Sequence, residues 1–182
     1  MALTATVYTF DVAVNDVDRG VYETLAIKAA RHPSESEDYL LTRVLAYCLE
    51  YTEGISFSKG GISDPEDPPL LVKDLTGAWR SWIEVGAPDA ARLHKASKAS
   101  PRVALYTHKE PRILFRGYEG QTIHRATQIE VIAMDRALLK ALAAHLDRRV
   151  RWSLTRTDDQ LFVDVAGETL TGSLERLRLP VT

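Results

Sequence analysis

The 182-residue sequence predicts a mixed α/β fold, and its hydrophobic pattern carries the prediction. Both ends of the chain alternate apolar and polar residues with a period of two, which is typical of half-buried antiparallel strands. The middle of the chain combines apolar residues at helical spacing with short apolar runs between them. We therefore expect a core sheet flanked by helices, and an accessory antiparallel β-sheet formed from the N- and C-terminal strands.

The N-terminal segment is expected to form a β-hairpin. Residues 4–14 place their large apolar side chains on one face, and residues 21–29 continue in an extended pattern. Asp16, Asp18 and Gly20 lie between these two segments and are typical turn residues. The first two strands should therefore pair with each other.

The first helix is expected to begin just after the hairpin. Ser34 and Glu37 have the three-residue spacing of a capping box, and His32 lies at the helix entry as a structural residue. Apolar residues then recur at helical spacing, so one face of this helix should pack on a core. The helix is expected to end near Tyr51.

The centre and the C-terminal part of the chain are expected to alternate short strands with two more helices. Pro88 and Asp89 mark the start of a helix of about three turns. Asp135 should cap the last helix. Strands are expected near residues 55–58, 78–85, 103–106, 112–115, 128–134, 151–155, 161–165 and 169–177, and residues 70–75 form a short segment before a turn.

Composition and charge exclude several classes of protein. Cys48 is the only cysteine, which excludes an internal disulfide framework and a cysteine-based zinc site. No apolar run approaches the roughly 18 residues of a membrane helix, and the first ten residues lack the features of a secretory signal. We therefore expect a cytoplasmic protein without a membrane partner. The formal net charge of −2 does not itself point to nucleic acid.

Acidic side chains from two stretches of chain form the first part of a candidate site. Glu84 lies near the end of an otherwise apolar strand, where a buried carboxylate is unfavourable unless it is paired or binds a metal. Asp64, Glu66 and Asp67 lie upstream in a loop that three prolines make rigid. Two converging carboxylates suit Mg²⁺, which prefers oxygen ligands, so Glu84 and an acid of this loop could bind a metal ion.

Basic side chains on the second helix form the other part. Arg92, Lys95 and Lys98 recur at three-residue spacing, so they share one broad face of that helix. A cation directed at the carboxylates could orient a water molecule or stabilise the charge of a phosphorane.

Each part of this constellation also has an ordinary structural interpretation. An acidic loop rich in proline is usually a solvated turn. Glu84 could instead cap the following helix or pair with Arg92. Three cations on one helical face often form a surface stripe. Other catalytic signals are missing, since the sequence has no HExxH, GxSxG, Walker or GxGxxG motif.

Three stretches of the sequence resemble the YaeQ family. They are Asp18-Arg19-Gly20-Val21-Tyr22, Arg31-His32-Pro33-Ser34-Glu35, and Trp82-Ile83-Glu84-Val85-Gly86 followed by Pro88-Asp89. With the short elements at residues 57–60 and 66–68, the resemblance spans essentially the whole chain. It implies one domain, with a restriction-endonuclease-like core over about residues 33–146 and an accessory sheet from about 3–30 and 147–178.

The resemblance also implies a site of the PD-(D/E)xK type. In nucleases of this type an acid on the first helix assists, two acids on and before the central strand bind metal, and a lysine follows. Glu35 would then be the helical acid, Asp67 (or Glu66) the first metal ligand, and Glu84 the second. Gly86 occupies the lysine position, so the missing cation would come from the helix, from the candidates Lys95, Lys98 and Arg92.

Two functions remain open at this point. The first is a metal-dependent nuclease that hydrolyses phosphodiester bonds of DNA or RNA with Mg²⁺ or Mn²⁺. The second is a catalytically inactive binding or regulatory module linked to transcription, which Gly86 and the modest net charge favour. The sequence predicts no particular protein partner.

Overall fold

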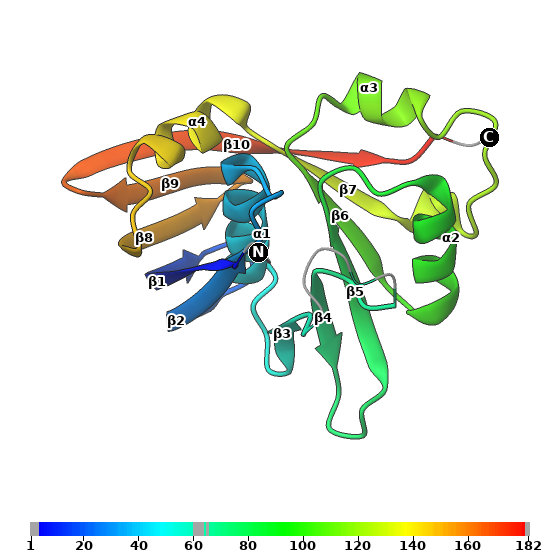
Figure 1. The fold of residues 1–182 in the computed structure, drawn as a ribbon, viewed down its shortest axis with the longest axis horizontal. Helices are drawn as coiled ribbons and strands as arrows, with labels where there is room; N and C mark the ends of the chain where they lie inside the picture. Colours follow the sequence, from blue (N-terminus) through cyan, green and yellow to red (C-terminus); the bar gives the residue numbers. More distant parts are fainter. Residues whose placement is uncertain (1–3, 60–63, 65, 181–182) are drawn as a thin grey trace. The chain divides into compact units, whose positions relative to one another are not determined.

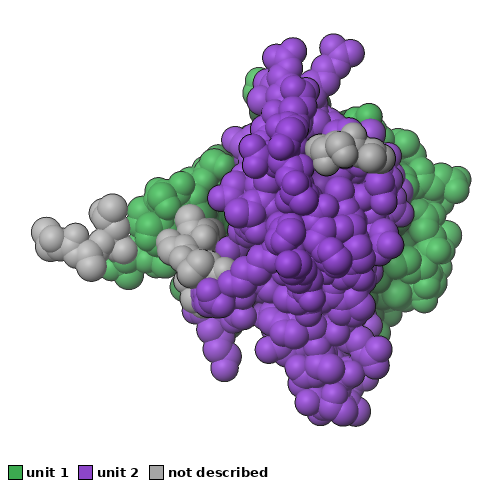
Figure 2. Space-filling view, turned by 90° about the vertical axis from the view of Figure 1, so that its right-hand side faces the viewer, with its two compact units in different colours: residues 1–51, 134–175 green, residues 52–133, 176–182 purple. Residues whose placement is uncertain are grey.

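The structure is a computed structural model that describes residues 4–59, 64 and 66–180 (Figure 1). Backbone contacts divide the chain into two compact units, coloured separately in Figure 2. Unit 1 comprises residues 1–51 and 134–175, and unit 2 comprises residues 52–133 and 176–182. In the described part of the chain, no helix combines the length and the apolar character that crossing a membrane requires.

Unit 1 combines five strands with two helices (Figure 1). The strand order is β2-β1-β8-β9-β10. Neighbouring strands are antiparallel, except that β1 and β8 are parallel. The bounds are β1 (Thr6–Asp16), β2 (Val21–Arg31), α1 (Glu37–Leu49), α4 (Arg136–Ala144), β8 (Arg149–Thr157), β9 (Gln160–Val165) and β10 (Glu168–Arg178), the last three residues of which fall in unit 2.

The parallel β1–β8 pair differs from the expected antiparallel sheet. Val12 of β1 lies opposite Trp152 of β8, with both strands running in the same direction. A hairpin turn forces two sequential strands to be antiparallel, but these two strands are far apart in the chain and no turn sets their direction. The terminal strands therefore do pair into one sheet, but that sheet is mixed.

Apolar side chains from the sheet of unit 1 pack against α1, as the alternating pattern predicted. Phe10 and Trp152 are fully buried neighbours, with ring centroids 5.1 Å apart. Cys48 is buried on α1, and burial raises the pKa of its thiol to about 12, so it is a core residue. The helix begins later than predicted, because Ser36 accepts the capping bond from the Tyr39 backbone N–H at 3.1 Å.

Unit 2 contains an antiparallel meander followed by two parallel strands. The order is β7-β6-β5-β4-β3, in which β3, β4 and β5 are antiparallel and β5, β6 and β7 are parallel. The bounds are β3 (Ile55–Phe57), β4 (Leu70–Lys73), β5 (Trp79–Val85), α2 (Ala90–Ala99), β6 (Val103–Thr107), α3 (Pro111–Arg116), the 3₁₀ helix η2 (Ala126–Gln128) and β7 (Glu130–Met134).

The segment expected as a strand at residues 112–115 forms the helix α3 instead. Pro111 takes a position in its first turn, and the carboxylate of Glu110 accepts a hydrogen bond from the Arg112 backbone N–H. A run of three apolar residues, Ile113–Phe115, suits a strand and a short helix equally well. The local capping residues therefore decided the outcome.

One face of the parallel strands in unit 2 is covered by α2 and α3. Leu93 of α2 and Leu114 of α3 belong to one buried cluster with Trp82 of β5. Because side chains two residues apart share a face of a strand, Glu84 points toward this helical layer together with Trp82. The fold thus places a carboxylate among apolar residues beneath α2.

Candidate functional site

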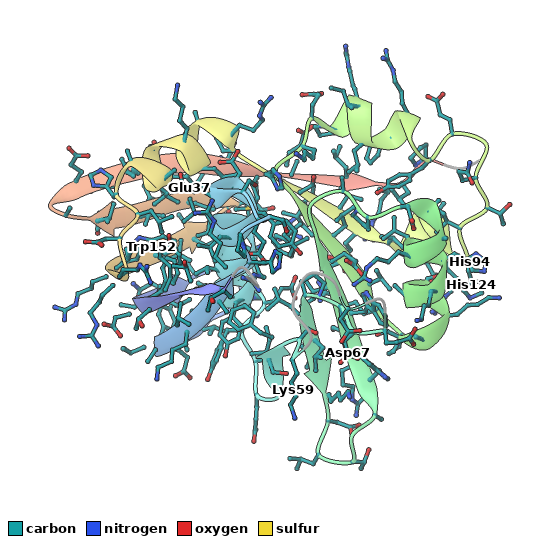
Figure 3. All side chains as sticks on the ribbon, in the orientation of Figure 1. Glu37, Lys59, Asp67, His94, His124 and Trp152 are labelled. Atoms are coloured by element: carbon teal, nitrogen blue, oxygen red, sulfur yellow. The ribbon has the colours of Figure 1, made fainter. Side chains whose placement is uncertain are left out.

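The pairing of β4 with β5 brings the two predicted metal ligands to the same end of the meander. Leu70 lies opposite Ile83 in the antiparallel register. Residues 67–69 come directly before Leu70, so the loop enters β4 at the end of the β4–β5 pairing that is next to Glu84. Asp67 lies beside β4 and β5 in Figure 3. The acidic loop and the acidic strand position therefore belong to one locality of unit 2.

Glu84 is a buried carboxylate with two strong donors. Its side chain is 2% exposed, and its Oε1 accepts hydrogen bonds from Trp82 Nε1 at 2.7 Å and Arg92 Nε at 2.6 Å. Burial raises the pKa of Glu84, while the charge of Arg92 and the two hydrogen bonds act in the opposite direction. The pairing with Arg92 is one of the structural alternatives that the sequence left open, and it is confirmed.

Arg92 connects Glu84 to the acidic loop. Its Nη1 donates to the main-chain oxygen of Asp64 at 3.0 Å, and its Nη2 donates to that of Asp67 at 2.9 Å. The helix that carries Arg92 is fixed by Asp89, whose carboxylate accepts from the Arg92 backbone N–H at 2.8 Å. One guanidinium therefore contacts three oxygens from two separate stretches of chain.

The loop itself is folded around the side chain of Asp64. Its Oδ1 accepts hydrogen bonds from the backbone N–H groups of Glu66, at 2.8 Å, and Asp67, at 3.3 Å. Glu66 pairs with Lys95 of α2 at 2.8 Å, but both side chains are substantially exposed. Such a pair contributes little to stability. Residues 60–63 and 65 of the predicted loop lie outside the described residues.

The remaining candidates are less closely associated with Glu84. Asp67 contacts Arg92 through its main-chain oxygen, and no described contact joins its carboxylate to that of Glu84. Lys98 is exposed on α2, where its charge and those of Arg125 and His94 contribute to lowering the pKa of His124, after desolvation. His94 and His124 lie next to each other, with ring centroids 6.3 Å apart (Figure 3).

Glu35 belongs to unit 1 and precedes α1 rather than lying on it. Its Oε2 lies 3.2 Å from Arg43 Nη2, and both side chains are almost fully buried. Burial raises the pKa of Glu35, and the charge of Arg43 acts against that rise. Arg43 also donates to the main-chain oxygen of Ala30 at 2.7 Å. The structure thus gives Glu35 a well-defined partner within unit 1.

The glycine at the expected lysine position has a structural reason. Gly86 has a φ of 89°, in a region that side-chain-bearing residues adopt only with strain. Its backbone N–H donates to the Tyr106 main-chain oxygen at 2.9 Å, which continues the pairing between β5 and β6. A lysine at this position would be strained, so the backbone here favours glycine.

Sequence reasoning missed two polar groups near Glu84. The indole N–H of Trp82 was counted only as part of an apolar run, although its position two residues before Glu84 signals a shared strand face. The Tyr118 hydroxyl donates to the main-chain oxygen of Pro88 at 2.8 Å, at the start of α2. Burial, followed by the charges of Glu84 and Asp89, raises the pKa of Tyr118. No local sequence signal identifies Tyr118.

The oxygens at this site are of the type that a hard divalent cation prefers. A carboxylate and two main-chain oxygens surround one positive group, the guanidinium of Arg92. Within the described ranges, no group of three or more His, Cys, Asp or Glu side chains is close enough to hold a metal ion. These oxygens are of the kind that Mg²⁺ or Mn²⁺ binds, and the guanidinium of Arg92 lies among them.

Known proteins similar to this chain share its sequence and its fold. The YaeQ protein family model matches residues 1–174. The uncharacterized YaeQ protein of Escherichia coli K12 is 31% identical over 165 residues, 90% of each chain, and that of Salmonella typhi is 30% identical over 182 residues, 99% of each.

Two solved YaeQ structures also match. The crystal structure from Pseudomonas syringae has a TM-score of 0.82 at 30% identity, covering 98% of this chain and 97% of the other. The crystal structure from Xanthomonas axonopodis pv. citri has a TM-score of 0.84 at 27% identity, covering 97% and 100%. The chain therefore belongs to the YaeQ family.

Proposed function

We propose that unit 2 binds nucleic acid and hydrolyses its phosphodiester bonds with a divalent metal ion held at Glu84 and Asp67. The observation that carries the proposal is the set of oxygens around the guanidinium of Arg92, which includes the buried Glu84 carboxylate. A buried carboxylate at the edge of a loop with further oxygens is the arrangement that a metal-dependent hydrolase needs.

The distribution of charge between the two units supports a polyanionic substrate. Unit 2 contains 13 Lys and Arg against 10 Asp and Glu, whereas unit 1 contains 10 against 15. The overall net charge of −2 thus divides into +3 on the unit with the candidate site and −5 on the other. Positive charge near the site would attract the phosphate backbone, so the acidic average of the chain does not oppose nucleic acid binding.

The order of elements also supports a restriction-endonuclease-like core. The chain runs from α1 through the meander β3-β4-β5 to α2 and β6, with Asp67 just before β4 and Glu84 on β5. This is the order in which the resemblance to PD-(D/E)xK nucleases places its two acids. Gly86 departs from that pattern, and α2 supplies the basic residues.

The proposed reaction assigns a task to each group. Arg92 and Trp82 hold the Glu84 carboxylate in place, and Lys95 or Lys98 on α2 would contact substrate phosphates. The ion, when bound, supplies positive charge that polarises a phosphoryl oxygen and activates water. Hydrolysis then breaks one P–O bond of the backbone and adds water across it. Glu35 is assigned no step.

The test compares two glutamates of unit 2 that each pair with an arginine. Glu84→Gln removes the charge of the proposed ligand, and Glu130→Gln is the matched control, because Glu130 pairs with Arg102. Purified proteins are incubated with single- and double-stranded DNA and with RNA, each with Mg²⁺ or Mn²⁺. Glu84→Gln should lower cleavage at least about 100-fold, while the control should retain it. Cleavage that survives Glu84→Gln would reject the proposed site.

A second candidate is a binding module without catalysis, acting as a regulatory protein linked to transcription. The ion pair between Arg92 and Glu84 favours it, because an internal cation already neutralises the carboxylate. This candidate predicts nucleic acid binding without cleavage, and no rise in melting temperature on adding Mn²⁺. A rise that Glu84→Gln abolishes would count against it, since a ligand of the native state must stabilise that state.

A further inference from the structure

The guanidinium of Arg92 occupies the oxygens that a metal ion would use. Its Nε, Nη1 and Nη2 each donate to a different oxygen, at distances of 2.6, 3.0 and 2.9 Å. We infer that Arg92 is the resident cation of this site and that a divalent ion has to compete with it for Oε1 of Glu84 and the two main-chain oxygens. This inference rests on the proposed function, because it concerns how the same site is regulated.

The hydrogen bonds of Glu84 leave little capacity on one of its oxygens. Oε1 already accepts from Arg92 Nε and from Trp82 Nε1. A carboxylate oxygen offers about two lone-pair sites, so both sites of Oε1 are in use. An Mg²⁺ ion needs an oxygen at about 2.0–2.1 Å, so binding to Oε1 requires that one of the two donors leaves.

Of these two donors, Arg92 is the one that can leave. Trp82 is 1% exposed and packed within the buried cluster under α2. The Arg92 side chain is 22% exposed and has several rotatable bonds, so it can rotate into solvent once its hydrogen bonds break. Its departure would also free the main-chain oxygens of Asp64 and Asp67. Removing one positive group would therefore release three oxygens at once.

Repulsion between the two positive charges also opposes binding of a metal ion next to Arg92. A guanidinium and a divalent ion that share one carboxylate oxygen would lie within a few ångströms of each other, and like charges at that distance repel strongly in a partly buried site. The two cations thus compete, and the free protein should hold Mn²⁺ weakly. Replacing the arginine should tighten binding.

The experiment measures Mn²⁺ binding directly, by the loss of the electron paramagnetic resonance signal of free Mn²⁺ during titration. The proteins are the full-length chain, Arg92→Ala and Arg102→Ala. Arg102→Ala is the matched control, because it also removes one positive charge and unpairs a glutamate of unit 2, Glu130. Arg92→Ala should bind Mn²⁺ at least about tenfold more tightly than the other two proteins. Adding Glu84→Gln to Arg92→Ala should abolish that gain.

Arg92→Lys covers the case in which Arg92→Ala fails to fold. Lysine keeps the charge but cannot span three oxygens, so this variant should show a smaller gain of the same sign. Equal or weaker Mn²⁺ binding by both Arg92 variants would overturn the inference, as would the absence of Mn²⁺ binding by every protein. The proposed function is judged separately: a tighter Arg92→Ala that cleaves no nucleic acid supports the inference and rejects the hydrolase.

Discussion

Both units bury a carboxylate against arginine, but they build the contact differently. In unit 1, the fully buried Asp16 accepts from Arg19 Nε at 2.7 Å and Arg156 Nη1 at 3.3 Å. Arg156 also contacts Asp18 at 3.1 Å and Asp159 at 2.7 Å. These residues come from the β1–β2 turn and from the end of β8 with its turn, so side-chain charges tie two hairpins together.

In unit 2, the corresponding arginine contacts one carboxylate and two main-chain oxygens. Arg92 therefore holds Glu84 and the backbone at Asp64 and Asp67, and no second arginine shares Glu84 in the described contacts. The network of unit 1 joins side chains of two turns, whereas Arg92 joins a strand carboxylate to the main chain of a loop. Arg43 of unit 1 makes a contact of the second kind, with the Glu35 carboxylate and the main-chain oxygen of Ala30.

The largest expected effect comes from unit 1. Arg156→Ala leaves Asp16 buried with one arginine and removes the partner of Asp18 and Asp159, so it should lower the free energy of unfolding by about 3–5 kcal/mol. Urea unfolding followed by tryptophan fluorescence measures the change. Arg151→Ala, at an exposed position of the same strand, is the control and should change stability by about 0.5 kcal/mol or less. A loss below about 1 kcal/mol for Arg156→Ala would show that the network is not a structural tie.

This network also shows which part of the fold the sequence could not predict. Asp16, Asp18 and Gly20 were recognised as turn residues, because turn chemistry is local. The partner Arg156 lies 140 positions from Asp16, and no local pattern connects them. The cap at Asp135 was predicted and confirmed for the same local reason, and Asp89, predicted near the start of a helix, is the N-cap of α2. The prediction of an antiparallel terminal sheet was wrong for β1 and β8, because tertiary contacts and no local turn set the direction of that pair.

The candidate site divides in the same way. The sequence predicted that Glu84 and Arg92 could pair, since a strand end and the next helix are close in any crossover. It did not predict that Arg92 would bind the main-chain oxygens of Asp64 and Asp67, because every residue has such an oxygen and the pattern carries no signal for it. The sequence placed Lys98 on one face of the second helix but did not predict which groups it would contact, and its side chain is exposed.

The second prediction uses pH to compare Glu84 with Glu130 within unit 2. Burial raises the pKa of Glu84, so its protonated form is favoured in the folded state. The stability that comes from protonating Glu84 in the folded state is fully present below the usual pKa of 4.5. It is lost as the pH rises through the raised pKa. The native protein should therefore lose stability relative to Glu84→Gln as pH rises.

Glu130 should give the opposite sign. Although burial acts to raise its pKa, the hydrogen bond and charge of Arg102 hold it below the usual value. The stabilisation it provides is present at higher pH and is lost as pH falls. Glu130→Gln should therefore become less stable than the native protein as pH rises. Urea unfolding at a series of pH values measures both variants, and the same trend for both would contradict this assignment.

The smallest expected effect tests whether nucleic acid binds unit 2 in particular. Lys98→Glu reverses a charge on the exposed face of α2, and Lys28→Glu makes the same change on β2 of unit 1. Fluorescence anisotropy with a labelled single-stranded oligonucleotide, without metal, should show binding weakened about 3- to 10-fold by the first and unchanged by the second. The salt dependence should also become shallower only for Lys98→Glu, since a lost phosphate contact releases fewer counterions. Equal weakening by both substitutions would mean that affinity follows the net charge of the whole chain, and the contrast between the two units would then carry no information about where the substrate lies.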